Sequence, residues 1–389
     1  MYFVGIDIAK YKHDCFITTE TGDVILNDLV FSNTRDGFNE LLSVLASLDH
    51  NQEIRIGFEA TGHYALNLKL FLEKTHYSFM EFNAVLLSKF NHSQTLRKTK
   101  TDAIDCASIA RWLMTVEYKP YPNGFYHMYS LKSLTRLRDS LVRQRSFYLV
   151  KITNVLDHTF PEFKPFFNNK FSKTAFFILR KYTSTDRIAY LNSRSYNDLH
   201  KISRGKFSLQ KFIKLKELAK NTVGASNSIF ESELTTLLSL HQNLDSEICK
   251  LESEIISLVT VLERPTITIP GIGPISAAII LSEYGDVCRF SGPAAMLSFA
   301  GLEPGYYQSG ISSHTGHMVK RGSSILRYTL MNCCLPLILH NLTFAEFYHK
   351  KRLEGKPHRV ALSHVAKKLI RVIYTLETNN IAFDSAKLI

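Results

Sequence analysis

The chain of 389 residues lacks the motifs that mark several common classes of protein. No glycine-rich phosphate loop follows any expected strand, which argues against a doubly wound nucleotide-binding domain. No pair of cysteines has Cys-x-x-Cys or zinc-site spacing, so no structural metal is expected. The absence of a disulfide pattern fits a reducing compartment. The six cysteines are Cys15, Cys106, Cys249, Cys288, Cys333 and Cys334.

Targeting and membrane signals are missing as well. The N-terminus MYFVGIDIAK has neither the basic start nor the long apolar run of a signal peptide. No apolar run is long enough to span a bilayer. We therefore expect a soluble, cytoplasmic protein with no membrane partner.

The net charge of +12 is unevenly distributed along the chain. Residues 1–120 hold 12 Lys and Arg against 15 Asp and Glu, whereas residues 121–220 hold 20 against 6. Residues 261–389 hold 14 against 8. Basic surfaces also serve solubility, but a basic middle rich in Tyr and Phe favours a polyanionic partner, namely nucleic acid.

The first 118 residues predict an α/β domain. Three apolar, β-branched runs at 2–8, 14–20 and 23–31 indicate an antiparallel meander. A helix over 36–48, a strand over 53–59, a helix over 63–74, a strand over 77–82 and a final helix through Asp105 follow. This order is that of a ribonuclease H-like fold.

Four carboxylates occur at informative places in this domain. Asp7 lies in an apolar strand, Glu59 ends the fourth strand, and Asp102 and Asp105 share one face of a helix that Thr101 can cap. Stacked carboxylates repel each other unless a cation lies between them, and Mg²⁺ or Mn²⁺ prefers such oxygen ligands. The alternatives are a buried structural aspartate at Asp7, a polar strand end at Glu59 and a solvated helix start.

The residues around these acids resemble a known family. GIDIAK, FEATGHY and RKTKTDAIDCASIAR are similar, in this order, to motifs of the N-terminal domain of DEDD transposases of bacterial insertion sequences, a group that includes pilin-gene invertases. The resemblance implies a fold like that of the RuvC Holliday-junction resolvases, with the four acids as magnesium ligands. Two ions held in this way stabilise the attacking and leaving oxygens of a phosphoryl displacement. Lys98 and Lys100 are candidates to hold a backbone phosphate, or form a solvated charge run.

Residues 125–262 predict a basic helical linker and a coiled coil. A long helix carries Arg136, Arg138, Arg143 and Arg145, which we interpret as nucleic-acid-facing or partner-facing, solvated arginines being the alternative. Most phenylalanines of 160–222 are expected in the core. The second helix has two heptad series, which argue for a coiled coil within the chain or between subunits. The series are Leu234, His241, Ile248, Ile255 and Leu262, and Leu237, Leu244, Leu251 and Leu258.

Residues 263–389 form the third expected domain, which is mainly helical. ITIPGIGPISAAIILSEYG resembles a helix-hairpin-helix, in which the Gly271 to Gly273 turn can approach phosphate. Residues 267–334 resemble the C-terminal domain of the same transposase family. On that resemblance Ser309 is the nucleophile that forms a phosphoserine link to DNA, although Ser312 and Ser313 lie close by. Three cations near an expected helix start at Ser323 suit a phosphate, namely Lys320, Arg321 and Arg327.

The sequence therefore predicts a DNA transposase or site-specific recombinase of an insertion sequence, with a metal-bound acid site and a serine nucleophile. The resemblance also implies a structured noncoding guide RNA, a dimer or tetramer, and a bacterial protein at the nucleoid when bound to DNA. One alternative is a junction-type nuclease in which the metal activates water and Ser309 is structural. The other is a nucleic-acid-binding protein without catalysis.

Overall fold

The computed structural model describes residues 1–60, 62–94, 102–121, 125–225, 227–309 and 312–387. The chain divides into two compact units, Met1–Tyr129 and Ser130–Ile389. Each is described by itself.

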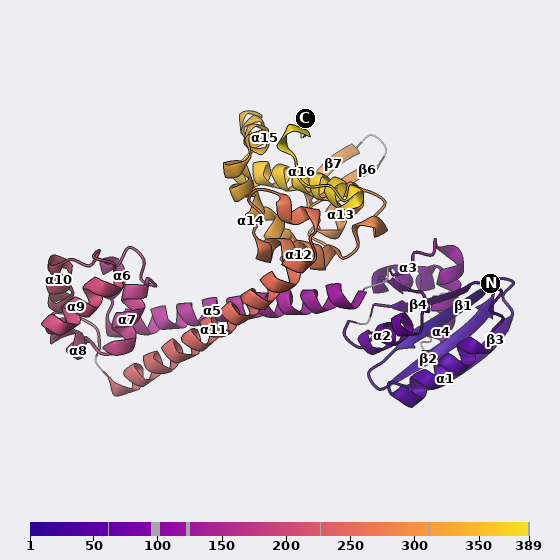
Figure 1. Ribbon diagram of the computed structural model, residues 1–389, viewed down its shortest axis with the longest axis horizontal. Helices are drawn as coiled ribbons and strands as arrows, with labels where there is room; N and C mark the ends of the chain where they lie inside the picture. Colours follow the sequence, from indigo (N-terminus) through magenta and orange to yellow (C-terminus); the bar gives the residue numbers. More distant parts are fainter. Residues whose placement is uncertain (61, 95–101, 122–124, 226, 310–311, 388–389) are drawn as a thin grey trace. The chain divides into compact units, whose positions relative to one another are not determined.

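The first unit is built on a five-stranded mixed sheet with the order β3-β2-β1-β4-β5 (Figure 1). β1 (Tyr2–Ile8), β2 (Lys12–Thr19) and β3 (Val24–Ser32) form the antiparallel meander that the sequence predicts. β4 (Ile54–Glu59) runs parallel to β1, and β5 (Phe79–Phe82) runs parallel to β4. The carboxyl ends of β1, β4 and β5 therefore meet at one edge of the sheet.

Helices cover both faces of this sheet, because successive side chains of a strand point to opposite faces. α1 (Arg35–Ala46) and α2 (Leu66–Lys74) contribute leucines to the core that contains Ile6 and Ile56. α3 (Ala84–Gln94) and α4 (Asp102–Thr115) pack on the face that carries Phe3. The sequence predicted one helix through Asp105, whereas the structure has two.

The second unit begins with two long helices that are connected in sequence by a group of short helices. α5 (Phe125–Thr159) and α11 (Ser228–Val261) are linked by ion pairs described below. Between them in sequence lie α6 (Phe163–Phe166), α7 (Lys173–Lys181), α8 (Thr185–Ala189), α9 (Ser193–Ile202) and α10 (Leu209–Lys220). Phe160, Phe163, Phe207 and Phe212 are buried among these helices, which confirms the expected core role.

The two heptad series of α11 differ in burial. The series that begins at Leu234 is buried through Ile255, and it includes His241 at 3% exposure. In the other series Leu237 is buried, Leu244 and Leu251 are half-buried, and Leu258 is 42% exposed. α11 therefore buries one complete stripe and leaves the second stripe partly open.

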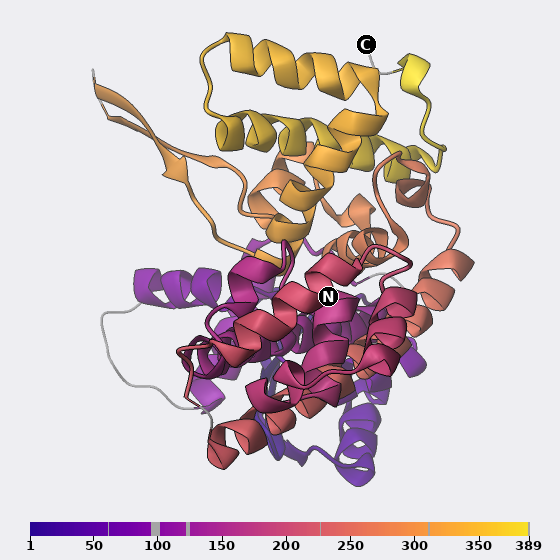
Figure 2. The ribbon, with the colours of Figure 1, turned by 90° about the vertical axis from the view of Figure 1, so that its left-hand side faces the viewer.

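The C-terminal part of the second unit is helical around one hairpin. Its 3₁₀ turns are η1 (Pro265–Thr268), η2 (Val287–Arg289) and η3 (Ser385–Lys387). Its helices are α12 (Pro274–Tyr284), α13 (Pro293–Phe299), α14 (Ser324–His340), α15 (Leu342–Leu353) and α16 (His358–Asn379). β6 (Pro304–Ser309) and β7 (Ser312–Met318) project from these helices as a two-stranded hairpin (Figure 2).

Apolar residues of α12, α14 and α16 form the core of this part. α16, the last long helix, therefore packs on the core of this part. At its end, the buried Glu377 side chain accepts from Thr266 Oγ1 at 2.6 Å and pairs with Arg264 Nη2 at 2.7 Å.

No single helix of the described residues is both long enough and apolar enough to cross a membrane. α14 and α15 pass that test only as a pair, and they meet at a bend of 109°.

Candidate active site and nucleic-acid contacts

Two of the four predicted acids end neighbouring strands. Ile6 of β1 pairs with Phe58 of β4, so Asp7 and Glu59 are the next residues along two parallel strands. Both residues are half-buried. A β-carbon added at Gly57 would meet α4 at Leu113 Cδ1, so the alternation along β4 directs Glu59 to the α4 face as well.

The third acid, Asp105, lies on α4, which packs directly against β1. A β-carbon at Gly5 would come within 2.3 Å of the Cys106 carbonyl oxygen, so only glycine permits this close approach. The next residue of the same face along β1 is Asp7, and the residue before Cys106 on α4 is Asp105. The strand order and this contact therefore bring Asp7, Glu59 and Asp105 to one end of one sheet face.

The electrostatics of Cys106 confirm how near the acids are. Burial above all, together with the negative charges of Asp7, Asp14 and Asp105, raises the pKa of its thiol to about 12. Its Sγ–H donates to the Asp14 carbonyl oxygen at 3.0 Å. A thiol with this pKa is protonated at neutral pH, and a protonated thiol is a poor nucleophile.

Asp14 is a carboxylate at this site that sequence reasoning missed. It faces Asp7 across the β1 and β2 pairing, and its side chain is 7% exposed. Lys12 Nζ lies 3.6 Å from its Oδ2. The available signal was that Asp14 directly precedes the apolar run CFIT, because a charge at a buried strand position needs a partner.

The fourth acid, Asp102, is the first residue of α4, where the sequence placed the helix start. Its side chain lies outside the described residues, as do Thr101, Lys98 and Lys100 altogether. Within the described part of the chain, no three His, Cys, Asp or Glu side chains are grouped so that they could hold a metal ion.

Ser309 belongs to the second unit. It is the last residue of β6 and pairs in register with Ser312, the first residue of β7. Its backbone therefore lies in a hairpin strand. The structure does not describe the side chains of Ser309, Ser312 and Ser313.

The base of the hairpin is held by several backbone contacts. Val319 N donates to Glu303 O at 3.0 Å, and Lys320 N donates to Gly301 O at 3.2 Å. Arg327 Nη1 lies within 3.3 Å of the carbonyl oxygens of both Ala300 and Lys320. This guanidinium therefore braces the two ends of the hairpin, and its contact with phosphate stays a prediction.

The other predicted C-terminal contacts lie near α12 and α14. Lys320 and Arg321 are exposed just before α14, and Ser323 caps this helix as expected by accepting from Leu326 N. Gly273 is exposed and caps α12. Gly271, in contrast, packs against the backbone of α14, and the first arm of the supposed helix-hairpin-helix is only the 3₁₀ turn η1.

The arginines of α5 are engaged with acids of the same unit. Arg138 pairs with Glu252 of α11, and Arg145 Nη1 lies 2.7 Å from Asp245 Oδ1 of α11. Partners late on α5 thus meet partners early on α11, so the helices run antiparallel. Arg143 pairs with Asp139 one helical turn away at 2.8 Å. These ion pairs give the arginines a structural role, and contact with nucleic acid stays a prediction.

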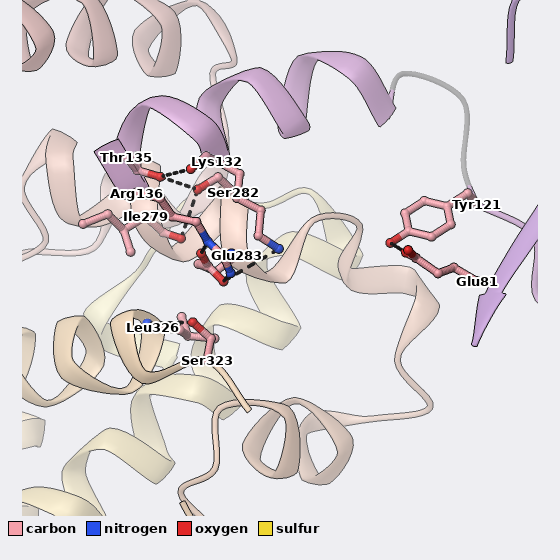
Figure 3. A network of polar contacts seen from close by, with 10 residues as sticks. All are labelled: Glu81, Tyr121, Lys132, Thr135, Arg136, Ile279, Ser282, Glu283, Ser323 and Leu326. Carbon is pink, nitrogen blue, oxygen red and sulfur yellow. Dashed lines mark hydrogen bonds and ion pairs between the residues drawn. The ribbon is translucent and has the colours of Figure 1, made fainter. Parts of the chain in front are cut away.

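Arg136 takes part in a buried network centred on Glu283 of α12 (Figure 3). Its Nε and Nη2 donate to the two carboxylate oxygens at 2.6 and 3.0 Å, and Lys132 Nζ lies 3.7 Å away. Burial raises the pKa of Glu283, but the hydrogen bonds and charges of Arg136, Lys132 and Ser323 outweigh it and leave this pKa below its ordinary value. Glu283 therefore joins α5, α12 and the start of α14.

Two family models match the chain. The DEDD transposase model of the IS110 group matches residues 4–161, and the model described as the transposase IS116/IS110/IS902 family matches residues 266–349. These spans contain the four acids and Ser309, respectively.

Individual relatives agree with these models. The pilin gene-inverting protein of Moraxella lacunata is 23% identical over 98% of this chain and 97% of its own length. The 44.8 kDa protein of insertion element IS116 from Streptomyces clavuligerus is 22% identical over 99% and 96%. The 43.6 kDa protein of insertion element IS110 from Streptomyces coelicolor is 26% identical over 42% of this chain and 40% of its own length.

Proposed function

Because the chain belongs to the IS110/IS116 family of transposases, enzymes that cleave and rejoin DNA, we propose that it recombines DNA by means of a set of acids and a serine nucleophile. The first unit contributes acids and the second contributes a serine. The main support for this proposal is that Asp7, Glu59 and Asp105 lie at one end of one sheet face.

The acids suit divalent metal ions. Their donors are carboxylate oxygens alone, and such donors favour Mg²⁺ or Mn²⁺ over softer metals. Asp7, Glu59, Asp102 and Asp105 would hold the ions, and the chemistry so supplied is stabilisation of charge on the attacking and leaving oxygens. The strand order and the α4 contact support a ribonuclease H-like, RuvC-like fold for the first unit.

The second unit would supply the nucleophile. Ser309 Oγ attacks a backbone phosphorus, a P–O bond to a deoxyribose oxygen breaks, and that oxygen leaves with a proton. A deoxyribose hydroxyl of another strand then attacks the phosphoserine and restores a phosphodiester. The number of phosphodiester bonds is unchanged, so this exchange needs no nucleotide hydrolysis. The braced base of the β6–β7 hairpin supports a fixed position for Ser309.

The partners follow from the same proposal. DNA is the substrate, and a structured noncoding RNA of the element guides the choice of sites. The short helices between α5 and α11 offer a basic surface for that RNA, since residues 160–222 hold 14 Lys and Arg against 4 Asp and Glu. We further propose that α5 and α11 form a coiled coil and that the partly open stripe of α11 joins subunits of a dimer or tetramer.

A gel assay for covalent adducts tests the chemistry. Wild-type protein is incubated with junction DNA, the element-derived RNA and Mg²⁺, and compared with Ser309→Ala and Asp102→Ala. We expect an SDS-resistant, protease-sensitive DNA band that both substitutions abolish. Ser312→Ala and Ser313→Ala are the matched controls, and each should retain the band.

The outcomes separate the proposal from its alternatives. Cleavage that survives Ser309→Ala without any adduct would mean a metal-dependent nuclease that uses water. Loss of the band in Ser312→Ala or Ser313→Ala, but not in Ser309→Ala, would identify Ser312 or Ser313 as the nucleophile instead. DNA binding without cleavage in the presence of Mg²⁺ or Mn²⁺ would mean that the protein binds nucleic acid without catalysing a reaction.

Mixing the two inactive variants tests whether the site forms between subunits. Ser309→Ala retains all four acids, and Asp102→Ala retains the serine. If acids and serine from different subunits form one site, a mixed oligomer contains some sites with both parts intact, and adduct reappears. If each chain completes its own site, the mixture stays inactive.

A further inference from the structure

Positive charge is concentrated on the last two long helices, outside every region considered so far. Residues 349–371 contain eight Lys and Arg, three His and a single acid, Glu354. They cover the end of α15, the connecting turn and the first four turns of α16. The two helices pack on each other in the C-terminal part of the second unit (Figure 2).

Most of these cations differ from the arginines of α5 in having no carboxylate partner. Glu354 is already paired with Lys351, whose Nζ lies 2.8 Å from Oε2. Lys350, Lys356, Lys367 and Arg371 form no ion pair with any residue in the described part of the chain. Whereas Arg136, Arg138 and Arg145 of α5 are neutralised by acids of α11 and α12, this positive charge is available to a ligand.

The cations also lie close enough to repel one another. Burial first, and then the charges of Lys367, Lys351 and Lys356, lower the pKa of His364. Burial and the charge of Arg371 lower the pKa of Lys367. On α16, positions 364, 367 and 371 fall on one helix face. A single surface therefore joins the turn to α16, the α15–α16 patch: Lys350, Lys351, Lys356, His364, Lys367 and Arg371.

We propose that the α15–α16 patch binds the phosphate backbone of duplex DNA. Cations that lie close together without acids repel one another, and bound phosphates reduce this repulsion. Residues 358–371 of α16 extend about 21 Å at 1.5 Å per residue, which matches about six base pairs of one strand. The choice of DNA rests on the proposed transposase function.

The side chains of this surface favour a duplex over a single strand. Binding of unpaired bases uses exposed aromatic rings for stacking. On α15 and α16, described throughout, no aromatic residue is among the exposed large apolar side chains. Phe344 is buried, and Lys368 Nζ lies 5.2 Å from the ring centre of Phe347. Cations without exposed phenylalanine, tyrosine or tryptophan rings suit backbone contacts that do not read sequence.

The test measures DNA binding by the full chain without Mg²⁺, so that cleavage plays no part. A fluorescein-labelled 20-base-pair duplex of arbitrary sequence is titrated by anisotropy between 50 and 200 mM KCl. The variant carries Lys356→Gln, Lys367→Gln and Arg371→Gln. We expect affinity at 100 mM KCl to fall about tenfold or more, and the slope of log affinity against log salt to fall by between one and three.

A matched control removes the same charge elsewhere. Arg35→Gln, Lys74→Gln and Lys89→Gln change three exposed cations of the first unit. A second variant, Lys356→Arg, Lys367→Arg and Arg371→Lys, keeps the charge and should keep the wild-type slope. Circular dichroism melts confirm that each variant is folded.

Two results would overturn the proposal. In one, the glutamine variant binds DNA as tightly as the matched control at every salt concentration. In the other, it keeps DNA binding but loses binding to an RNA hairpin of equal length, which would make the patch an RNA surface. Failure of the proposed function appears differently, as wild-type protein that binds DNA yet forms no adduct.

Discussion

Glu283 offers the sharpest test of how the second unit is held together. Its side chain is 1% exposed and receives two charge-assisted hydrogen bonds from Arg136. In Glu283→Gln, one oxygen becomes an amide nitrogen that faces the guanidinium, so one such bond is lost and two donors meet. A charge-assisted hydrogen bond contributes about 1.5–3 kcal/mol. Because Arg136 is 51% exposed and can be rehydrated, we expect about 2 kcal/mol instead of the roughly 3–5 kcal/mol of a fully buried pair.

Hydrogen exchange of the intact protein measures this effect locally, since a chain with two units need not unfold in one step. We expect amides of α12 and of the adjoining part of α5 to lose about 2 kcal/mol of protection at neutral pH. Arg143→Gln is the control on the same helix. Its side chain is 66% exposed and its partner lies one turn away, so it should cost at most about 0.5 kcal/mol. A Glu283→Gln effect as small as this control would refute the reasoning.

The pH dependence gives an independent check. The folded state holds the pKa of Glu283 below its ordinary value. A lowered pKa means that the stabilisation is complete above the unfolded-state pKa, near pH 4.3, and is lost as pH falls through the folded-state pKa. Wild-type protection of α12 should therefore fall in acid more steeply than that of Glu283→Gln. Equal slopes would show that the carboxylate does not couple protonation to folding.

Three further predictions concern other parts of the chain. Lys69→Met should destabilise the first unit by roughly 2–4 kcal/mol, because Glu81 of β5, whose Oε1 lies 2.6 Å from Lys69 Nζ, loses its buried partner. Unfolding can be followed by the fluorescence of the single tryptophan, Trp112 on α4. Gly322→Ala should cost about 2 kcal/mol or more in thermal melts, because its φ is +97° and a β-carbon would lie 2.0 Å from a carbonyl oxygen. Gly273→Ala meets no neighbouring atom and changes only the N-cap residue of α12, so it should cost less, about 0.5–1 kcal/mol. Cys249 and Cys288 should react with maleimide in the native protein, since both are exposed while the other four cysteines are buried, and mass spectrometry counts the labels.

The first unit was predictable because its signals are local. Alternating apolar runs gave the five strands, and a strand followed by a helix gave the parallel pairings. The end of α3 was not predictable from breaker residues, because neither glycine nor proline occurs between Ala84 and Asp102. Likewise, Asp14 was missed because its partner Asp7 lies on another strand. The register that brings them together is a property of the sheet.

The site residues show the same division. The helix start at Asp102 and the strand end at Glu59 follow from caps and strand lengths, which are short-range features. The roles of Arg327 and Gly271 depend on what packs against them. Arg327 reaches two carbonyl oxygens at the hairpin base, and Gly271 meets the backbone of α14. Their sequence neighbourhoods, one basic and one rich in glycine, would have suited phosphate equally well.

Charge counts predict a partner more reliably than they predict its place. The basic middle of the chain indicated nucleic acid, yet Arg136, Arg138 and Arg145 are neutralised by acids located more than 95 residues later in the sequence. Those acids are numerous on α11, so a helix that appeared exposed and cationic in isolation becomes half of an antiparallel ion-paired arrangement. The α15–α16 patch has a smaller total charge, but its acids are too few to do the same. Available charge, after internal ion pairs are subtracted, is therefore the quantity that should locate a polyanion on this protein.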